Sequence, residues 1–136
     1  MSSSTSSRLL YTALIRTHHI TSRKKLQRVK KSALQHELPY VLVRSGGAPG
    51  IMYAEAPKES TLAAWVAGVH DLRYKDFQCV RKPALQRILL GAVSDGKGAQ
   101  SPSFKELETT AEFGRVMEEK GLGDWWRVGM GYQTEE

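Results

Sequence analysis

The chain has 136 residues, of which 40% are hydrophobic and 25% are charged, and its formal net charge is +6. This balance is typical of one globular domain and excludes a disordered chain, and no run approaches the roughly 20 apolar residues of a membrane-spanning helix. The single cysteine, Cys79, excludes an internal disulfide and a zinc site of several cysteines, so we expect a reducing compartment.

The N-terminal residues allow two interpretations. Residues 1–8 are rich in serine and are expected to form a disordered lead, after which residues 11–20 are β-branched and aromatic enough to predict a strand. The same stretch contains serine and arginine and lacks acidic residues, which is the composition of a mitochondrial transit peptide. A mitochondrial location therefore stays open as a minor alternative to the nucleus or cytoplasm.

A basic helix is predicted next. Thr21 or Ser22 can cap its N-terminus, and Pro39 ends it. Lysine and arginine cover most of its surface. Its apolar face at helical spacing consists of Leu26, Val29, Ala33 and Leu34.

Residues 40–44 and 51–54 predict two short strands, which a loop rich in glycine and proline joins as a hairpin. Residues 59–72 predict a second helix with an apolar stripe, and Ser60 is a candidate for its N-cap. Residues 75–80 then predict a closing strand.

The order strand, helix, strand, strand, helix, strand over residues 9–83 predicts an α+β fold of the ferredoxin-like βαββαβ type. In this fold a four-stranded antiparallel sheet carries both helices on one face. We expect the strand at 11–20 to pair with the strand that contains 51–54. The other face of the sheet would be open unless another segment covers it.

The rest of the chain predicts a C-terminal helical extension. Residues 84–102 are expected to form a short helix and a linker, and residues 103–136 an acidic, tryptophan-rich segment. Ser103 and Glu106 have the spacing of a capping box, which predicts a helix from there to about residue 120. A short helix would carry Trp125 and Trp126, and we expect both indoles to dock against the domain because they would otherwise leave a large apolar patch in water.

Charge is distributed unevenly along the chain. Residues 1–36 contain basic residues and no acidic ones, whereas residues 104–136 are predominantly acidic. Such polarity favours an anionic partner at the basic part. The alternative is a solvated basic helix whose charge the acidic tail balances.

The junction between the first strand and the basic helix carries the candidate site. Amides at a helix start attract anions, while three cations there, Arg23, Lys24 and Lys25, oppose the helix dipole by about 0.3–1 kcal/mol each. A bound phosphate would remove this cost, so we predict phosphate contacts from these residues and from Arg28.

Two histidines precede these cations. Adjacent strand residues point to opposite faces, so His18 and His19 are not expected to share a metal ion, and one of them is expected to contact a ligand. The sequence has no hydrolase or metalloprotease motif and no carboxylate pair outside the acidic tail. We therefore expect no catalytic activity, no cofactor and no metal.

Several short motifs are dispersed over residues 9–82. They are His18-His19-Ile20, the lysine-rich helix start, Pro49-Gly50-Ile51 with Glu55, and Leu72-Arg73-Tyr74-Lys75. Together they resemble the C-terminal domain of pre-mRNA processing factor 3, a small nuclear ribonucleoprotein family whose domain also follows RWD domains in other proteins. The resemblance implies a ferredoxin-like fold and RNA binding, as in mRNA splicing, with His18, His19, Arg23, Lys24 and Lys25 at the matching positions.

The leading hypothesis is thus a stand-alone RNA-binding protein, without a membrane partner, that works by phosphate contacts and by accepting bases near the two histidines. The alternative is a protein-interaction module in which Trp125, Trp126 and Tyr132 anchor a partner. A protein partner within a ribonucleoprotein is compatible with both.

Overall fold

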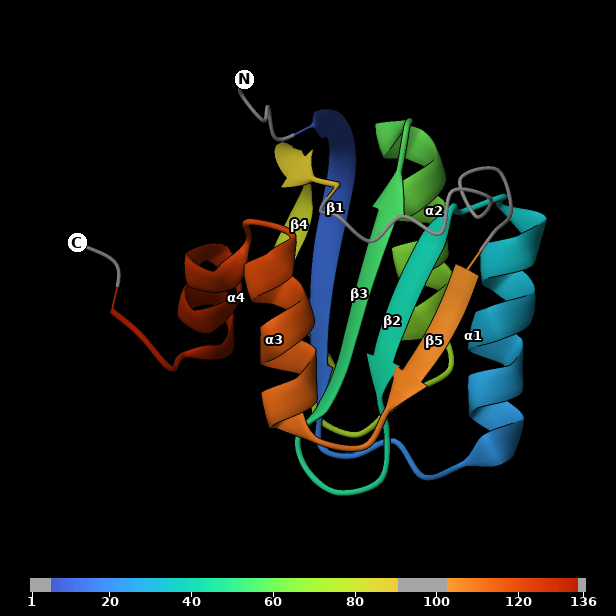
Figure 1. Cartoon of the computed structure of the whole chain (residues 1–136). Coiled ribbons are helices and arrows are strands. Elements are labelled where there is room, and N and C mark those ends of the chain that lie inside the picture. The colour runs from blue at the N-terminus through green and yellow to red at the C-terminus, as the bar shows by residue number, and fades with distance from the viewer. Residues whose placement is uncertain (1–5, 91–102, 135–136) are drawn as a thin grey trace.

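A computed structural model describes residues 6–90 and 103–134 of the chain, which form an α+β fold with a five-stranded mixed sheet and four helices (Figure 1). No helix in this described part is long and apolar enough to cross a membrane. In chain order the elements are β1 (Ser7–Thr17), α1 (Arg23–Gln35), β2 (Tyr40–Arg44), β3 (Gly50–Ala56), α2 (Glu59–His70), β4 (Gln78–Leu89), β5 (Ser103–Leu107), α3 (Thr110–Glu119) and α4 (Gly123–Met130).

The strands lie in the order β4-β1-β3-β2-β5. The pairing of β1 with β3 is antiparallel and places Ala13 opposite Ala54, which confirms the predicted partnership of these strands. The β2 and β3 hairpin is also confirmed. The prediction of a purely antiparallel sheet is wrong, because β5 adds to the edge of β2 in the parallel direction.

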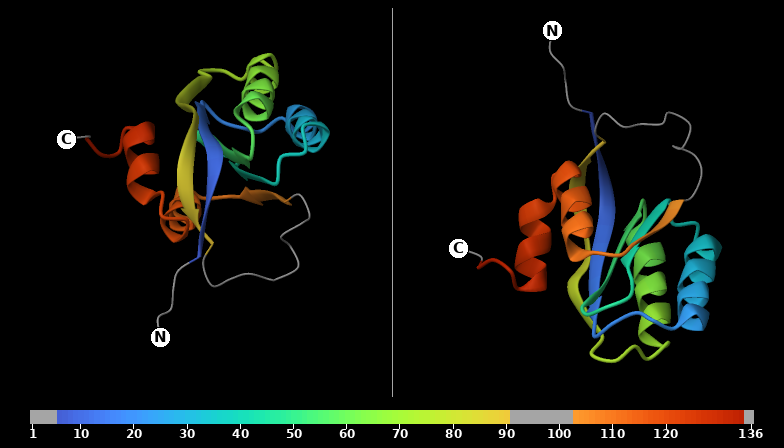
Figure 2. Two further views of the ribbon diagram at one scale, coloured as in Figure 1. Left: turned by 90° about the horizontal axis from the view of Figure 1, so that it is seen from above. Right: turned by 60° about the horizontal axis from the view of Figure 1, so that its bottom comes forward.

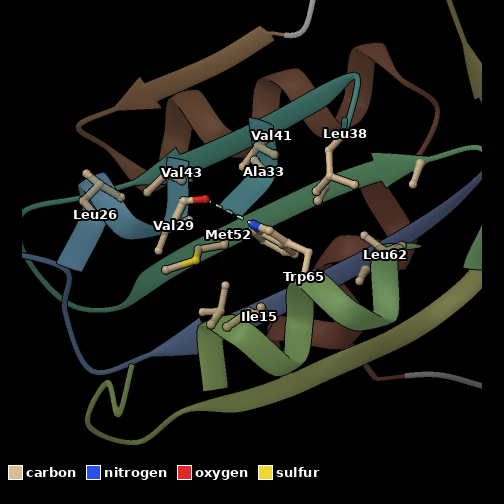
Figure 3. Packing of buried hydrophobic residues seen from close by; sticks show 14 of the residues in the cluster. Ile15, Leu26, Val29, Ala33, Leu38, Val41, Val43, Met52, Leu62 and Trp65 are labelled. Atoms are coloured by element: carbon tan, nitrogen blue, oxygen red, sulfur yellow. Dashed lines mark hydrogen bonds between the residues drawn. The ribbon is translucent and has the colours of Figure 1, made fainter. Parts of the chain in front are cut away.

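Helices cover both faces of the sheet. Figure 2 shows α1 and α2 on one side and α3 and α4 on the other. The layer beneath α1 and α2 is centred on Trp65, which is fully buried and whose indole N–H donates to the carbonyl of Val29 at 3.4 Å (Figure 3). This bond ties α2 to α1 across the hydrophobic core.

The two helices of this layer begin and end close to where the sequence predicts. The Ser22 hydroxyl accepts from the amide of Lys25 and so caps α1, and Leu26, Val29 and Ala33 are buried as expected. Leu34 differs, because it is exposed. Lys58, not Ser60, occupies the N-cap of α2, and no side chain caps that helix.

The second layer confirms that the C-terminal segment docks on the sheet. Trp126 is only 5% exposed and stacks on Phe113, with ring centroids 6.1 Å apart. Trp125 lies edge-on to Tyr53 of β3 at 6.0 Å. The sheet face that the four-stranded prediction left open is therefore covered by α3 and α4.

The capping box was predicted at the wrong place. Residues 103–107 are strand β5, and α3 begins later, where Thr109 and Glu112 form the reciprocal capping bonds. Ser103 and Glu106 have the same spacing in the sequence, but the backbone of their segment pairs with β2, and this pairing prevails over the local signal.

The last strand of the predicted domain is longer than expected. β4 continues to Leu89, so residues 84–89 are a strand and not the start of a short helix. Their partner is the first part of β1, which begins at Ser7 and therefore includes the end of the predicted lead. Residues 1–5 of that lead and the predicted linker at 91–102 lie outside the described residues.

Candidate nucleic-acid interface

Some backbone amides at the start of α1 already have hydrogen-bond acceptors within the chain. The Ser22 hydroxyl accepts from the Lys25 amide at 3.1 Å, and the Ser22 carbonyl accepts from the Leu26 amide at 3.1 Å. A phosphate at this end would therefore meet side chains more than cap amides, contrary to the simplest form of the sequence prediction.

Arg23 is held by an acidic residue from the far end of the chain. Its guanidinium donates two bonds to the Glu106 carboxylate of β5, at 2.7 and 3.0 Å, and the Ser45 hydroxyl donates to the same carboxylate. The hydrogen bonds from Arg23 make the largest contribution to lowering the pKa of Glu106, and the bond from Ser45 lowers it further. Sequence reasoning missed Glu106 because it lies 83 positions away, and Arg23 is thus partly neutralised.

Lys25 also lies against the protein. Its ammonium donates to the carbonyl of Arg73 at 3.3 Å and lies 5.2 Å from the ring centroid of Tyr74. The aromatic ring and the carbonyl hold this cation at the surface, where one side of it still faces solvent.

Three of the four remaining cations of α1 form an exposed row, and the fourth, Lys30, lies over the ring of Phe104. Lys24, Arg28 and Lys31 recur at helical spacing over about 10 Å of the axis, and we call these three residues the α1 ridge. Among the residues that the structure describes, no carboxylate forms an ion pair with any of them. Among the predicted site residues, Lys24 and Arg28 thus have no carboxylate partner within the described residues, and Lys25 contacts only a carbonyl and an aromatic ring there.

The two histidines lie beyond the end of β1. Their ring centroids are 4.7 Å apart and tilted by 50°, so the expectation that they point to opposite faces is wrong. The alternation of side chains ends with the strand at Thr17, and the backbone turns after that residue. His18 Nδ1 lies 3.7 Å from Asp76, and in the described part of the chain no cluster could hold a metal ion.

A shallow groove opens beside His18. Its volume is about 560 Å³, and it lies at the end of the sheet where β1 leads into α1. Thr17 is buried at its base, and the Thr17 hydroxyl has no hydrogen-bond partner among the described residues. The groove is lined by Arg16, Thr17, His18, Pro49, Phe77 and Gln78, among others.

Tyr74 lies beneath Lys25 with its hydroxyl buried and, within the described residues, without a hydrogen-bond partner. Burial raises the pKa of Tyr74 to about 12, although the charge of Arg23 opposes this shift. Because this pKa is raised, the folded state favours the neutral phenol over the charged form. The resulting contribution to folding stability is fully present below about pH 10 and is lost as the pH rises toward 12.

Tyr74→Phe is expected to leave the free energy of unfolding unchanged at pH 8 or to raise it by up to about 1 kcal/mol, because the variant buries no unsatisfied hydroxyl. It should also lose less stability than the wild type between about pH 10 and 12. Urea unfolding at pH 8 and between about pH 10 and 12 measures both effects, with Tyr132→Phe at the exposed surface as the control. A loss above about 1 kcal/mol at pH 8 would mean that the hydroxyl has a partner.

The three C-terminal aromatic residues do not form one surface. Trp126 is buried, Trp125 is partly covered by the guanidinium of Arg81 at 5.6 Å from its ring, and Tyr132 is exposed with its ring 5.5 Å from Trp126. The indoles therefore serve the packing of the second layer in this structure. Of the three candidates for partner contacts, Tyr132 is the one whose ring is largely open to solvent.

The junction thus brings together free cations, two histidine rings and a groove that Arg16 and Phe77 line. Cations of this kind contact phosphates, and flat rings stack on bases. No protein-family model matches the chain, and no curated protein matches it. The case for a function therefore depends on the arrangement of these residues.

Proposed function

We propose that this chain is a non-catalytic, single-stranded RNA-binding protein whose α1 ridge holds backbone phosphates. The observation that carries the proposal is the free charge of Lys24, Arg28 and Lys31, which have no carboxylate partner within the described residues. Each unpaired cation on a helix surface can neutralise one phosphate and release its counterion.

The position of the acidic residues supports the same proposal. Helices α3 and α4, which contain four of the 14 acidic residues, cover the sheet face opposite α1 (Figure 2). Arg23 with Glu106 is the only ion pair between α1 and the C-terminal segment in the described part of the chain. The acidic segment thus balances little of the basic helix, and a field of one sign remains over α1.

The groove beside His18 supplies the second half of the mechanism. Phosphates on the α1 ridge would position the strand, and an unstacked base would enter the groove against His18 or Phe77. Arg16 at the same groove offers a donor to a base edge or to a further phosphate. His18 and the first turn of α1 belong to one short connection, so a single RNA strand could contact both.

The fold assignment at finer detail belongs to this proposal. The order β4-β1-β3-β2, with α1 and α2 on one face, supports a ferredoxin-like unit to which β5, α3 and α4 are added. The likeness to the domain of pre-mRNA processing factor 3 suggests an RNA-processing ribonucleoprotein, with a protein partner in that particle. A nuclear or cytoplasmic location follows from that likeness, and a mitochondrial one stays as the minor alternative.

Reversing two charges of the ridge, Lys24→Glu with Arg28→Glu, is expected to weaken binding to several RNA sequences alike. It should reduce the slope of log K against log salt by about 1.4, which is roughly 0.7 for each phosphate contact of a single strand. Fluorescence anisotropy of a short labelled RNA between about 50 and 200 mM salt measures both quantities.

The matched control for this variant is Lys105→Glu with Arg115→Glu, which makes the same change in net charge at exposed residues of β5 and α3. It should alter the slope much less. The proposal fails if the wild type binds RNA no better than a scrambled basic peptide with the charges of α1, or if the control variant loses as much slope as the ridge variant.

His18→Ala is expected to reduce the preference of the protein for particular RNA sequences. Loss of a ring that stacks on a base costs about 1–3 kcal/mol for the preferred sequence, and less for sequences that place no base in the groove. The salt slope should stay near that of the wild type, because no phosphate contact is removed. The same anisotropy titration over homopolymeric RNAs tests this, and an equal loss for every sequence would contradict a role in base contact.

A further inference from the structure

The outer end of the β1 and β4 pair extends past the rest of the sheet. Residues Ser7–Leu10 of β1 pair with β4 alone, because the pairing with β3 begins at Tyr11. β4 is the last strand in the sheet order on this side, so its outer edge has no neighbouring strand among the described residues. Figure 1 shows β4 at this edge beside β1.

The backbone of this edge offers free hydrogen-bonding groups. The Leu90 amide donates to the Ser6 carbonyl, and in an antiparallel pair such bonded positions alternate along the strand. The amides and carbonyls of Leu85 and Arg87 therefore point away from β1. The amide of Leu89 supports this alternation, because it donates outward to the carbonyl of Lys120.

The side chains at this edge are apolar and exposed. Leu9 is 53% exposed, Leu85 is 49% and Leu90 is 44%, and these are three of the five large exposed hydrophobic residues in the described part of the chain. The register pairs Leu9 with Arg87 and Tyr11 with Leu85, so Leu9, Leu85 and Arg87 share one face. We call Leu9, Leu85 and Arg87, with the outward backbone groups of the last two, the β4 edge.

Exposed cations lie on both faces of this pair of strands. Arg87 shares the face of Leu9 and Leu85, whereas Arg8, which is opposite Ile88, lies on the other face. Arg8, Lys82 and Arg87 are exposed, and none of them pairs with a carboxylate in the described residues. Arg87 donates to the hydroxyl of Ser7 at 3.1 Å, which leaves its charge uncompensated. A partner at this edge should therefore carry acidic side chains together with apolar ones.

We propose that the β4 edge binds an extended acidic segment of another protein, which adds as a further strand beside Leu85 and Arg87. The added strand would satisfy the outward amides and carbonyls, bury Leu9 and Leu85, and place carboxylates on the opposite face, near Arg8. A second copy of this chain fits less well, because it would bring the same cations to the interface. A lipid surface would leave the backbone groups of the edge without partners.

The edge also limits the length of the segment that it accepts. Pro83 has no amide hydrogen to donate, and beyond Arg87 the carbonyl of Lys120 already occupies the Leu89 amide. Pairing is thus confined to the few residues between these two points. A short segment with apolar and acidic residues in alternation would place its apolar side chains on the face of Leu9 and Leu85 and its carboxylates on the opposite face, where Arg8 lies.

The test is a nuclear magnetic resonance titration of the full chain with a short peptide that alternates isoleucine and glutamate. The amide signals of Leu85 and Arg87 are expected to shift most. Arg8→Glu should weaken binding roughly tenfold through lost charge complementarity. Lys31→Glu makes the same charge change on the α1 ridge and should leave the affinity within about twofold.

Leu85→Pro removes an outward amide and keeps the bonds to β1, so it should abolish binding while the variant stays folded. Should that variant fail to fold, a peptide with methylated backbone nitrogens provides the same test, because it lacks the amide hydrogens that would pair with the β4 edge. This peptide should not bind. Because the β4 edge is distinct from the α1 ridge, this result is independent of RNA binding.

Four results would overturn the proposal. The first is equal binding of a peptide with lysine in place of glutamate, and the second is a set of shifts centred on the α1 ridge. The third is binding of vesicles that contain phosphatidylserine at Leu85 without binding of the peptide. The fourth is a shift of the Leu85 signal with protein concentration alone, which would identify a second copy as the occupant.

Discussion

Lys120→Met is expected to lower the free energy of unfolding by about 3–5 kcal/mol, the usual cost of removing one partner of a buried ion pair. The Lys120 ammonium lies 2.8 Å from the Glu55 carboxylate, whose side chain is only 6% exposed. Methionine keeps most of the volume, so the loss reports the charge. Glu55 would remain buried with the Tyr53 hydroxyl as its one hydrogen-bond donor within the described residues.

The surroundings of this pair add to the expected effect. The Lys120 ammonium lies 4.0 Å from the ring centroid of Tyr40, which gives a cation–π contact in a partly dry site. Burial and then the charge of Glu55 raise the pKa of Tyr53 well above its usual value, so its hydroxyl remains a donor to that carboxylate. Lys120 thus fastens the end of α3 to the centre of the sheet.

Urea unfolding of Lys120→Met, Glu55→Gln and the double variant measures this as a double-mutant cycle. The double variant should lose less than the sum of the single changes, because it leaves no charge buried alone. Lys105→Met on exposed β5 is the control and should stay within about 0.5 kcal/mol of the wild type. A loss of less than about 1 kcal/mol for Lys120→Met would mean that the ion pair of Lys120 and Glu55 contributes little to the stability of the folded protein.

Trp126→Ala is expected to cost a similar 3–5 kcal/mol, because it leaves a large cavity between α4 and α3. The indole stacks on Phe113 and lies so close to Gly114 that a Cβ there would be 2.8 Å from the ring. Both contacts belong to α3, so the variant should loosen the whole second layer and not the last helix alone.

Thermal and urea unfolding give the magnitude for Trp126→Ala. The quenchable part of the tryptophan fluorescence in this variant gives the location of the change, because Trp65 is fully buried and Trp125 is the other remaining indole. Trp125 should become more accessible to a quencher, because α4 is less firmly held. Tyr132→Ala, at an exposed ring, should change stability by less than about 1 kcal/mol. If Trp126→Ala is as mild as that control, the C-terminal segment does not contribute its packing to the folded state.

Local patterns were sufficient to predict much of the first layer. The helical spacing of Leu26, Val29 and Ala33, with Ser22 before them, placed α1 within about one turn, and the glycine-rich loop placed the β2 and β3 hairpin. These signals come from residues that are neighbours in the chain, so no knowledge of the remaining fold was needed.

The errors in the strand assignments involve partners that are distant in sequence. Residues 84–89 form a strand because the first part of β1 pairs with them, and residues 103–107 form a strand because β2 does. Short mixed segments of this kind are compatible with helix or strand until their neighbour is known. The extra strand made the sheet mixed, a property that no window of the sequence contains.

In the candidate site, too, some features could be predicted from the local sequence and others depend on the fold. The free charge of Lys24 and Arg28 could be predicted from composition, because α1 contains no acidic residue. The neutralisation of Arg23 could not, since Glu106 reaches it only after β5 has joined the sheet. The closeness of the two histidine rings depends on where β1 ends, and strand ends are the least predictable feature of a sequence.

The place of α3 and α4 at the end of the chain has a consequence for folding during synthesis. Domains tend to fold from the N-terminal side during synthesis, at about 5–20 residues per second. The apolar face that carries Leu14, Leu42 and Tyr53 is complete early, yet the helices that cover it contain residues 110–130. For several seconds on the ribosome this face has no cover, so nascent chains stalled before residue 110 should be the ones that chaperones retain.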